Sequence, residues 1–315
     1  MKRPLVSFII PVLNGEKDMA RCLTSIRNQD CSAEDYEVLV VDNGSTDRTD
    51  QIVHAFGINL KVVPGVSVAA LRNHGAETAL GDYLAFVDVD VELAPAWLQN
   101  GLWGFRDRKV VAIGGPRDMP GGSTWVQRAW GLHLESHRPK DQPASVPWLY
   151  SMAFMVRRSE FLAIRGFADN LETAEDVDLC YRLGRLGTII YDPAMRAIHW
   201  GEDPDLATFW NKEVWRGRSN LKGVLSHGLR SDELPSLGYP IYVLLLVLFL
   251  SLSCVLDVWN RQFNLTLISL GLLSLPALIL ATDTTRRVRK PIALPKLFLL
   301  YFIYGLARAY SIVRT

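Results

Sequence analysis

The chain has 315 residues, of which 49% are hydrophobic and 21% charged, and its formal net charge is +1. This length allows one large domain with an addition or two domains, and the balanced charge excludes the basic excess typical of nucleic-acid-binding proteins. Apolar residues form short runs up to about residue 235 and are nearly continuous beyond it. We therefore expect a globular domain over residues 1–235 and a membrane segment over residues 236–315.

Short apolar runs alternate with helical patterns in the first third of the chain. Residues 6–10, 37–41, 60–63 and 83–87 have the composition of buried strands, and residues 16–28 and 67–80 are helical in pattern. Basic residues precede the first run, but Pro11 interrupts it and no small-residue cleavage site follows, so we expect a strand rather than a signal peptide. This alternation predicts an α/β fold with a mostly parallel sheet and flanking helices.

Polar side chains follow three of these strands: Asn14, Asp42, and the pair Asp88 and Asp90. Ligands of such sheets bind beyond the carboxyl ends of the strands, so we expect these residues to line one site. The first turn, PVLNGEK, has a single glycine, which argues against a GxGxxG dinucleotide site. A divalent metal held by carboxylates can neutralise a diphosphate instead. The alternative that Asp88 and Asp90 are only turn residues stays open.

The four cysteines, Cys22, Cys31, Cys180 and Cys254, have no CxxC spacing. They lie in apolar or helical surroundings rather than in a short, cysteine-rich framework. We expect reduced thiols in a reducing compartment, and neither disulfides nor a zinc site.

Four segments resemble a family 2 glycosyltransferase of the GT-A (Rossmann-like) fold. They are VSFIIPVLNGEKDMARCLTSIRNQ, EVLVVDNGSTDRT, ALRNHGAETALGDYLAFVDVD and AEDVDLCYRLGRLG, in this order over roughly residues 5–199. The resemblance implies an inverting, metal-dependent enzyme that uses a UDP-, GDP- or dTDP-sugar. It also implies that Pro11, Asn14 and Asp42 line the nucleotide pocket and that Arg72 approaches the nucleotide or its phosphates.

The same resemblance implies the metal site and the catalytic base. Asp88 and Asp90 would form a DxD motif, in which Asp90 binds the metal and Asp88 contacts the ribose or the metal. His199 matches the position of a third metal ligand in some members, and imidazole with carboxylates favours Mn²⁺ over Mg²⁺. Asp176 would be the catalytic base, supported by Glu175.

Two of these assignments have structural alternatives. Thr173 and Asp176 have the spacing of a capping box at the start of a helix whose apolar stripe is Leu179, Leu183 and Leu186. His199 taken alone is also compatible with an ordinary, partly buried histidine. The sequence leaves both alternatives open.

The chain departs from the family pattern at three places. The usual Tyr-Asn-Glu after the first strand is Leu13-Asn14-Gly15, and the usual NMA before the base is SMA at residues 151–153. The QxxRW motif of processive members is absent, so we expect transfer of a single sugar. In its region lies FWNKEVWRGRSN, residues 209–220, whose aromatic and basic residues suit a lipid diphosphate or the membrane headgroups.

Residues 114–146 are rich in glycine and proline and lack clear periodicity. Long irregular stretches in compact domains are usually functional or mobile. We expect a loop that orders over donor and acceptor, with a disordered surface insertion as the alternative.

The C-terminal part is predicted to enter a membrane. Residues 241–256 and 263–281 contain no charged residue, so we expect spans at about 241–259 and 263–281. A third run gives a span or an interfacial helix at about 294–312. The basic stretch TTRRVRKP after the second span predicts a cytoplasmic loop. The catalytic domain would then be cytoplasmic in a multi-pass protein of a bacterial inner or plasma membrane.

Together these features predict transfer of one sugar from a nucleotide sugar to a lipid-linked acceptor, such as a polyprenyl-diphosphate sugar, in polysaccharide assembly. One alternative is a synthase that charges polyprenyl phosphate with a monosaccharide. The other is a non-catalytic nucleotide-sugar-binding membrane scaffold or sensor.

Overall fold

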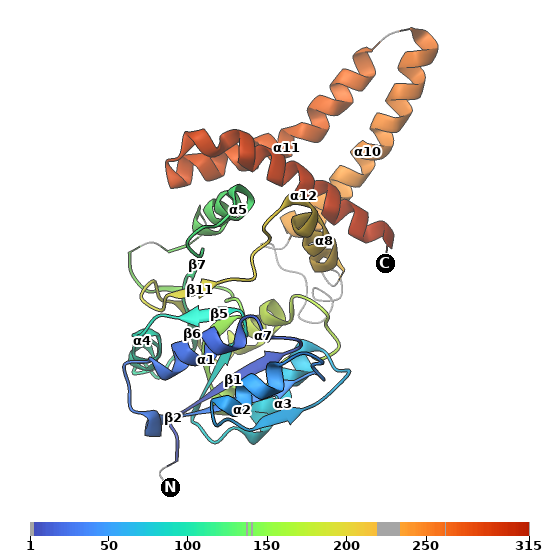
Figure 1. The fold of residues 1–315 in the computed structure, drawn as a ribbon. Helices are drawn as coiled ribbons and strands as arrows, with labels where there is room; N and C mark the ends of the chain where they lie inside the picture. Colours follow the sequence, from blue (N-terminus) through green and yellow to red (C-terminus); the bar gives the residue numbers. More distant parts are fainter. Residues whose placement is uncertain (1–2, 137, 140, 219–233, 262, 315) are drawn as a thin grey trace. The chain divides into compact units, whose positions relative to one another are not determined.

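The computed structural model describes residues 3–136, 138–139, 141–218, 234–261 and 263–314. The chain forms two compact units (Figure 1). Unit 1 comprises Met1–Pro120 and Pro139–Glu202, and unit 2 comprises Gly121–Arg138 and Asp203–Thr315.

Unit 1 is built on an eight-stranded mixed sheet with the order β3-β2-β1-β4-β9-β6-β10-β8. The pairs β1–β2, β1–β4, β2–β3 and β6–β10 are parallel, whereas β9 runs antiparallel to both of its neighbours. The strands are β1 (Val6–Val12), β2 (Tyr36–Asp42), β3 (Leu60–Val62), β4 (Tyr83–Val87), β6 (Val110–Gly114), β8 (Ala144–Ser145), β9 (Ala153–Arg157) and β10 (Thr188–Tyr191). The predicted mostly parallel α/β sheet is confirmed.

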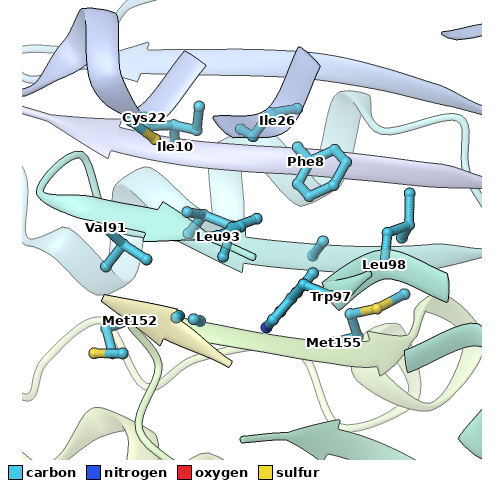
Figure 2. Packing of buried hydrophobic residues seen from close by; sticks show 14 of the residues in the cluster. Phe8, Ile10, Cys22, Ile26, Val91, Leu93, Trp97, Leu98, Met152 and Met155 are labelled. Carbon is cyan, nitrogen blue, oxygen red and sulfur yellow. The ribbon is translucent and has the colours of Figure 1, made fainter. Parts of the chain in front are cut away.

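Helices cover both faces of this sheet because side chains alternate along its strands. Phe8 and Ile10 of β1 pack with α1, whereas Ile9 points to the other face and packs with α3. Figure 2 shows Cys22 and Ile26 of α1 above this part of β1. The helices of unit 1 are α1 (Met19–Arg27), η1 (Ala33–Asp35), α2 (Thr49–Ala55), α3 (Val68–Thr78), α4 (Trp97–Gly104), α6 (Arg158–Ala163) and α7 (Glu175–Leu183). The predicted buried strand at residues 6–10 is confirmed by β1.

A second, three-stranded sheet in unit 1 has the order β5-β11-β7. Its strands are β5 (Val91–Leu93), β7 (Arg117–Asp118) and β11 (Ala197–His199). The turn from Asp88 to Val91 joins β4 of the large sheet to β5 of the small one, with the Val91 N–H donating to the Asp88 carbonyl at 3.1 Å. Asp88 and Asp90 therefore lie where the two sheets meet.

Among its described residues, unit 2 contains three helical segments long and apolar enough to cross a membrane: Gly238–Asn260, Asn264–Val288 and Pro291–Arg314. Its helices are α5 (Trp125–Ser136), α8 (Leu206–Gly217), α10 (Leu234–Asn260), α11 (Asn264–Val288), η3 (Pro291–Ala293) and α12 (Leu294–Arg314). The predicted hairpin is confirmed, because the consecutive helices α10 and α11 pack on each other. The third apolar run is a continuous helix of 21 residues.

The prediction of an irregular loop over residues 114–146 was wrong. The segment contains the twelve-residue helix α5, whose buried residues Val126, Ala129 and Trp130 pack with α11 and α12. The helical spacing is present in the sequence, but Gly131 and the flanking glycines and prolines obscure it. Tertiary burial of the apolar face stabilises this helix more than its intrinsic propensity does.

The structure also bears on two smaller predictions. All four cysteines are free thiols in the structure. The predicted aromatic and basic segment, residues 209–220, begins in α8. Residues 219–233, which include the last two residues of this segment, lie outside the described part of the chain.

Candidate active site

The loops after β1 and β2 are joined by side-chain hydrogen bonds. Because these strands are parallel neighbours, with Val12 opposite Asp42, both loops leave the same edge of the sheet. The amide oxygen of Asn14, a residue with φ of 54°, accepts from the Thr46 N–H at 2.9 Å. The Asp42 carboxylate is buried and accepts from the Ser45 N–H at 3.0 Å. The predicted pocket residues Asn14 and Asp42 thus come together, and both stabilise the loops.

Arg72 lies at the centre of a buried charge cluster. Its guanidinium, on α3, donates to Asp88 Oδ1 at 2.7 Å and to Glu175 Oε1 at 2.9 Å, and the side chain is only 3% exposed. Burial acts to lower its pKa, but the two carboxylates outweigh burial and raise it. Its Nε is buried without a hydrogen-bond partner in the described structure. Arg72 thus ties the end of β4 to the start of α7.

Asp176 follows Glu175 in the first turn of α7 and is half-buried. Ser151 donates its N–H to Oδ2 at 3.4 Å, and Val177 donates its N–H to Oδ1 at 2.8 Å. Burial, followed by the negative charge of Glu175, raises the pKa of Asp176 to about 7. A carboxylate that titrates near neutrality is suited to general-base catalysis.

The alternative capping box at Thr173 was wrong. The N-cap of α7 is Ala174, which has a left-handed φ of 62° and makes no side-chain cap hydrogen bond. The predicted stripe is also shorter than expected, because α7 ends at Leu183 and Leu186 is 50% exposed. The Asp176 carboxylate is therefore not used as a helix cap for Thr173.

His199 lies next to Asp90 because β11 pairs antiparallel with β5, which puts His199 opposite Val91. Its Nε2 is 3.4 Å from Asp90 Oδ1, and its Nδ1 is 2.8 Å from Glu202 Oε1. Burial lowers the pKa of His199, but hydrogen bonds to both carboxylates raise it to about 9. Glu202 is itself buried and pairs with Arg117 Nε at 3.1 Å. The imidazole is thus held on one side by an ion pair and faces Asp90 on the other.

No group of three or more His, Cys, Asp or Glu side chains in the described structure is arranged to hold a metal ion. The three predicted ligands do not meet, since Asp88 pairs with Arg72 while Asp90 and His199 face each other. An imidazole nitrogen and a carboxylate oxygen are donors suited to Mn²⁺. The backbone also approaches closely, because a Cβ added at Gly201 would lie 1.9 Å from Asp90 Oδ2. Asp90 and His199 therefore bring together two donor types that fit a divalent metal.

Sequence reasoning missed three residues of this site. Ser151 donates to Glu175 Oε1 at 3.4 Å through its hydroxyl, besides its contact with Asp176. Glu202 follows His199 by three residues, a spacing at which the pair could have been noticed. Arg117 carries no sequence signal, because it is 85 positions from Glu202 and reaches it only through the fold.

Comparison with known proteins identifies the family of the chain. The model of "Glycosyl transferase family 2" matches residues 7–163, which include Asp42, Arg72, Asp88 and Asp90. This chain belongs to glycosyltransferase family 2. Asp176 and His199 lie beyond the matched residues, so their places in this glycosyltransferase rest on the structure described above.

Curated relatives include the glycosyltransferase AglE of Haloferax volcanii, with 36% identity over 133 residues, 40% of this chain and 44% of the relative. The pre-mycofactocin glycosyltransferase of Mycobacterium tuberculosis is 31% identical over 207 residues, 62% of this chain and 42% of the relative. The chain thus spans less than half the length of these two relatives.

A solved structure with the same fold is the mannosyltransferase PcManGT from Pyrobaculum calidifontis in complex with GDP-Man and Mn²⁺. The alignment has a TM-score of 0.65 and 19% identity, and covers 99% of this chain and 88% of the other. At this identity the likeness shows the GT-A fold.

Proposed function

We propose that this family 2 glycosyltransferase transfers a single sugar, with inversion, from a UDP-, GDP- or dTDP-sugar to a lipid-linked acceptor. The observation that carries the proposal is the Arg72 bridge. One buried guanidinium holds both Asp88 of the DxD motif and Glu175, the neighbour of Asp176. A candidate base and a candidate donor site therefore belong to one cluster, as a single displacement requires. The complex of the mannosyltransferase PcManGT with a nucleotide sugar and Mn²⁺ supports the donor class.

In this proposal Asp176 removes the proton from the acceptor hydroxyl as the hydroxyl oxygen attacks the anomeric carbon. The attack comes from the face opposite the nucleoside diphosphate, which leaves with the electron pair of the broken bond. Glu175, held by Arg72 and Ser151, keeps the start of α7 in place and raises the basicity of its neighbour. Asp88 contacts the ribose with the carboxylate oxygen that Arg72 does not bind.

Asp90 and His199 would hold the metal, with Mn²⁺ favoured over Mg²⁺ because of the imidazole. When bound, the ion supplies Lewis-acid stabilisation of the leaving diphosphate. Glu202 orients the imidazole through its Nδ1, as carboxylates commonly do for metal-ligating histidines. Pro11, Asn14 and Asp42 line the nucleotide pocket in this proposal.

The acceptor and the location rest on unit 2. Three helices long enough to span a bilayer support a membrane protein whose acceptor is a lipid, such as a polyprenyl-diphosphate sugar. Arg286, Arg287, Arg289 and Lys290 lie around the end of α11, which favours the cytoplasmic side for the α11–α12 connection. Since α10 and α11 form a hairpin, the catalytic domain lies on that side too, at a bacterial inner or plasma membrane.

The test uses membranes that contain the full chain, incubated with Mn²⁺ and a panel of radiolabelled nucleotide sugars. We expect label from one donor to enter the organic phase, and membranes with Asp176→Asn to give none. Label on a sugar already linked through a diphosphate identifies the proposed acceptor, whereas label on polyprenyl phosphate alone identifies a monosaccharide synthase. If no donor is consumed although nucleotide sugars bind, the protein is a non-catalytic sensor or scaffold and the proposal fails.

A further inference from the structure

Unit 2 contains a cavity of about 310 Å³ between α5, η3 and the start of α12. Three of its lining residues are cationic, Arg128, Lys290 and Lys296, although almost all of the cavity surface is apolar. Its apolar wall is formed mainly by Trp125, Leu132 and Ile292. Cationic and large apolar residues thus surround one mostly apolar space.

The three cationic residues are exposed. The Arg128 guanidinium donates to the backbone carbonyl of Ser123, which is a neutral group. Among the ion pairs of the described residues, none joins Arg128, Lys290 or Lys296 to a carboxylate. Three positive charges therefore lie around the cavity, and an anionic group is the one that complements them.

The apolar wall indicates that the anion is attached to a hydrocarbon. Ile292 is 91% exposed, although it is one of the most hydrophobic residue types, and it stands two residues from Lys290. The cavity lies where α11 ends and α12 begins, at the ends of two helices long enough to cross a membrane. In the membrane placement proposed above, this is the depth at which a bilayer changes from acyl chains to headgroups. A free phosphate would contact only the cationic residues, whereas a lipid contacts the cationic residues with its headgroup and the apolar wall with its acyl chain.

We propose that this cavity binds the phosphate of an anionic phospholipid, with Arg128, Lys290 and Lys296 around the headgroup. The first part of an acyl chain runs along Trp125, Leu132 and Ile292. The lipid joins α5 to the α11–α12 connection, which are far apart in the chain. This role is additional to sugar transfer, and its test measures lipid binding directly, so its failure would leave the proposed enzyme function untouched.

The first experiment titrates the purified full-length chain in detergent with short-chain phosphatidylglycerol by isothermal titration calorimetry. We expect saturable binding of one lipid per chain. Phosphatidylcholine with the same chains lacks the net negative charge, and inorganic phosphate lacks the hydrocarbon, so both should bind at least about tenfold more weakly. Equal affinity for phosphatidylcholine would overturn the proposal, as would tight binding of an isoprenyl diphosphate without binding of phosphatidylglycerol.

Matched variants separate this site from diffuse attraction to basic residues. Lys296→Gln and Arg128→Gln should each weaken phosphatidylglycerol binding about fivefold. Arg286→Gln removes the same charge from the end of α11 but not from the cavity, and should change affinity less than twofold. Equal losses in all three variants would mean that no built site exists.

A further variant, Ile292→Asn, tests the apolar wall. Ile292→Asn should weaken phosphatidylglycerol binding and leave the weak binding of inorganic phosphate unchanged. Because the side chain is almost fully exposed, this change and Lys296→Gln leave the packing of unit 2 intact. They keep the test decisive even where Arg128→Gln lowers thermal stability. An unchanged phosphatidylglycerol affinity in Ile292→Asn would exclude the proposed path of the acyl chain.

Discussion

Asp88 and Asp90 are separated by one residue but have different surroundings. Asp88 is bound to Arg72, which is nearly fully buried and also binds Glu175. Asp90 faces the imidazole of His199, which a second carboxylate holds from behind. The two acids of the DxD motif are therefore not equivalent, and the structure divides them between two clusters.

The charge balance of the two clusters explains what each is suited to do. Around Arg72, Asp88 and Glu175 bind the guanidinium directly, and Asp176 lies beside them without an ion pair. Burial, followed by the negative charge of Glu175, raises the pKa of Asp176. Around His199 two acids are matched by an imidazole and Arg117. In the proposed function the first cluster supplies the base and the second supplies the metal ligands. The two acids of one motif thus have different neighbours in the fold, and for this reason we propose different roles for them.

The first prediction concerns Asp176→Asn, for which we expect the greatest loss of activity. Because the amide cannot accept a proton, we expect the transfer rate to fall by about 1,000-fold, while donor affinity stays within twofold. Initial rates and calorimetric titration with the nucleotide sugar measure the two effects. Glu172→Gln, which removes an exposed acid just before α7, is the control and should keep the wild-type rate. A wild-type rate in Asp176→Asn would remove the base from the proposal.

The second prediction concerns the His199 cluster. Asp90→Asn should weaken Mn²⁺-dependent donor binding by about 100-fold, because it removes a charged donor next to the imidazole. Asp88→Asn should have a smaller effect on this binding, since that carboxylate is engaged by Arg72. Calorimetric titrations with and without Mn²⁺ measure both, with the exposed Asp82→Asn as control. Equal losses in Asp88→Asn and Asp90→Asn would show that the two acids act alike.

The third prediction concerns Glu202, whose carboxylate contacts Nδ1 of His199. Glu202→Gln should weaken Mn²⁺ binding about tenfold, because a ligating histidine loses the carboxylate that orients it. Electron paramagnetic resonance of free Mn²⁺ measures this affinity without any turnover. Glu77→Gln is a matched control, since His74 and Glu77 have the same spacing and a 3.3 Å contact but are exposed. An unchanged Mn²⁺ affinity in Glu202→Gln would mean that Glu202 has only a structural role.

The smallest and most gradual effect is the pH dependence of the Arg72 cluster. With a pKa of about 7, Asp176 is increasingly protonated as the pH falls, so the rate should drop about tenfold per pH unit below 7 and level off above it. Initial rates between pH 5 and pH 9 at saturating Mn²⁺ measure the profile. A profile that stays flat down to pH 5 would contradict the raised pKa.

The same raised pKa has a consequence for stability. The folded state favours neutral Asp176, so this contribution is fully present below its ordinary pKa of 3.8 and is lost as the pH rises through about 7. Asp176→Asn should therefore gain thermal stability over the wild type between these values, and keep a constant advantage above pH 7. Thermal unfolding in detergent at several pH values measures this. An advantage that is independent of pH would argue against the linkage.

Local sequence patterns determined much of this molecule. The strands of residues 6–10 and 83–87, the polar residues after them and the apolar helices of the C-terminal part are all visible as runs of one residue type. Such runs report burial, because a strand covered on both faces or a helix in a membrane tolerates few polar side chains. One edge of the sheet carries Asn14, Asp42, Asp88 and Asp90, because the strands that precede them, β1, β2 and β4, are parallel neighbours.

Only the tertiary structure decided which of these polar groups are partners. Arg72 and Glu175 are 103 positions apart, and they meet because α3 and α7 both pack beside a sheet into which β9 is inserted antiparallel. The Arg117–Glu202 pair depends in the same way on β7 and β11 lying side by side. An ion pair between distant segments leaves no local periodicity, since its energy depends on strand order and burial. For this reason the sequence predicted the site's residues, while the division of Asp88 and Asp90 between two clusters came from the fold.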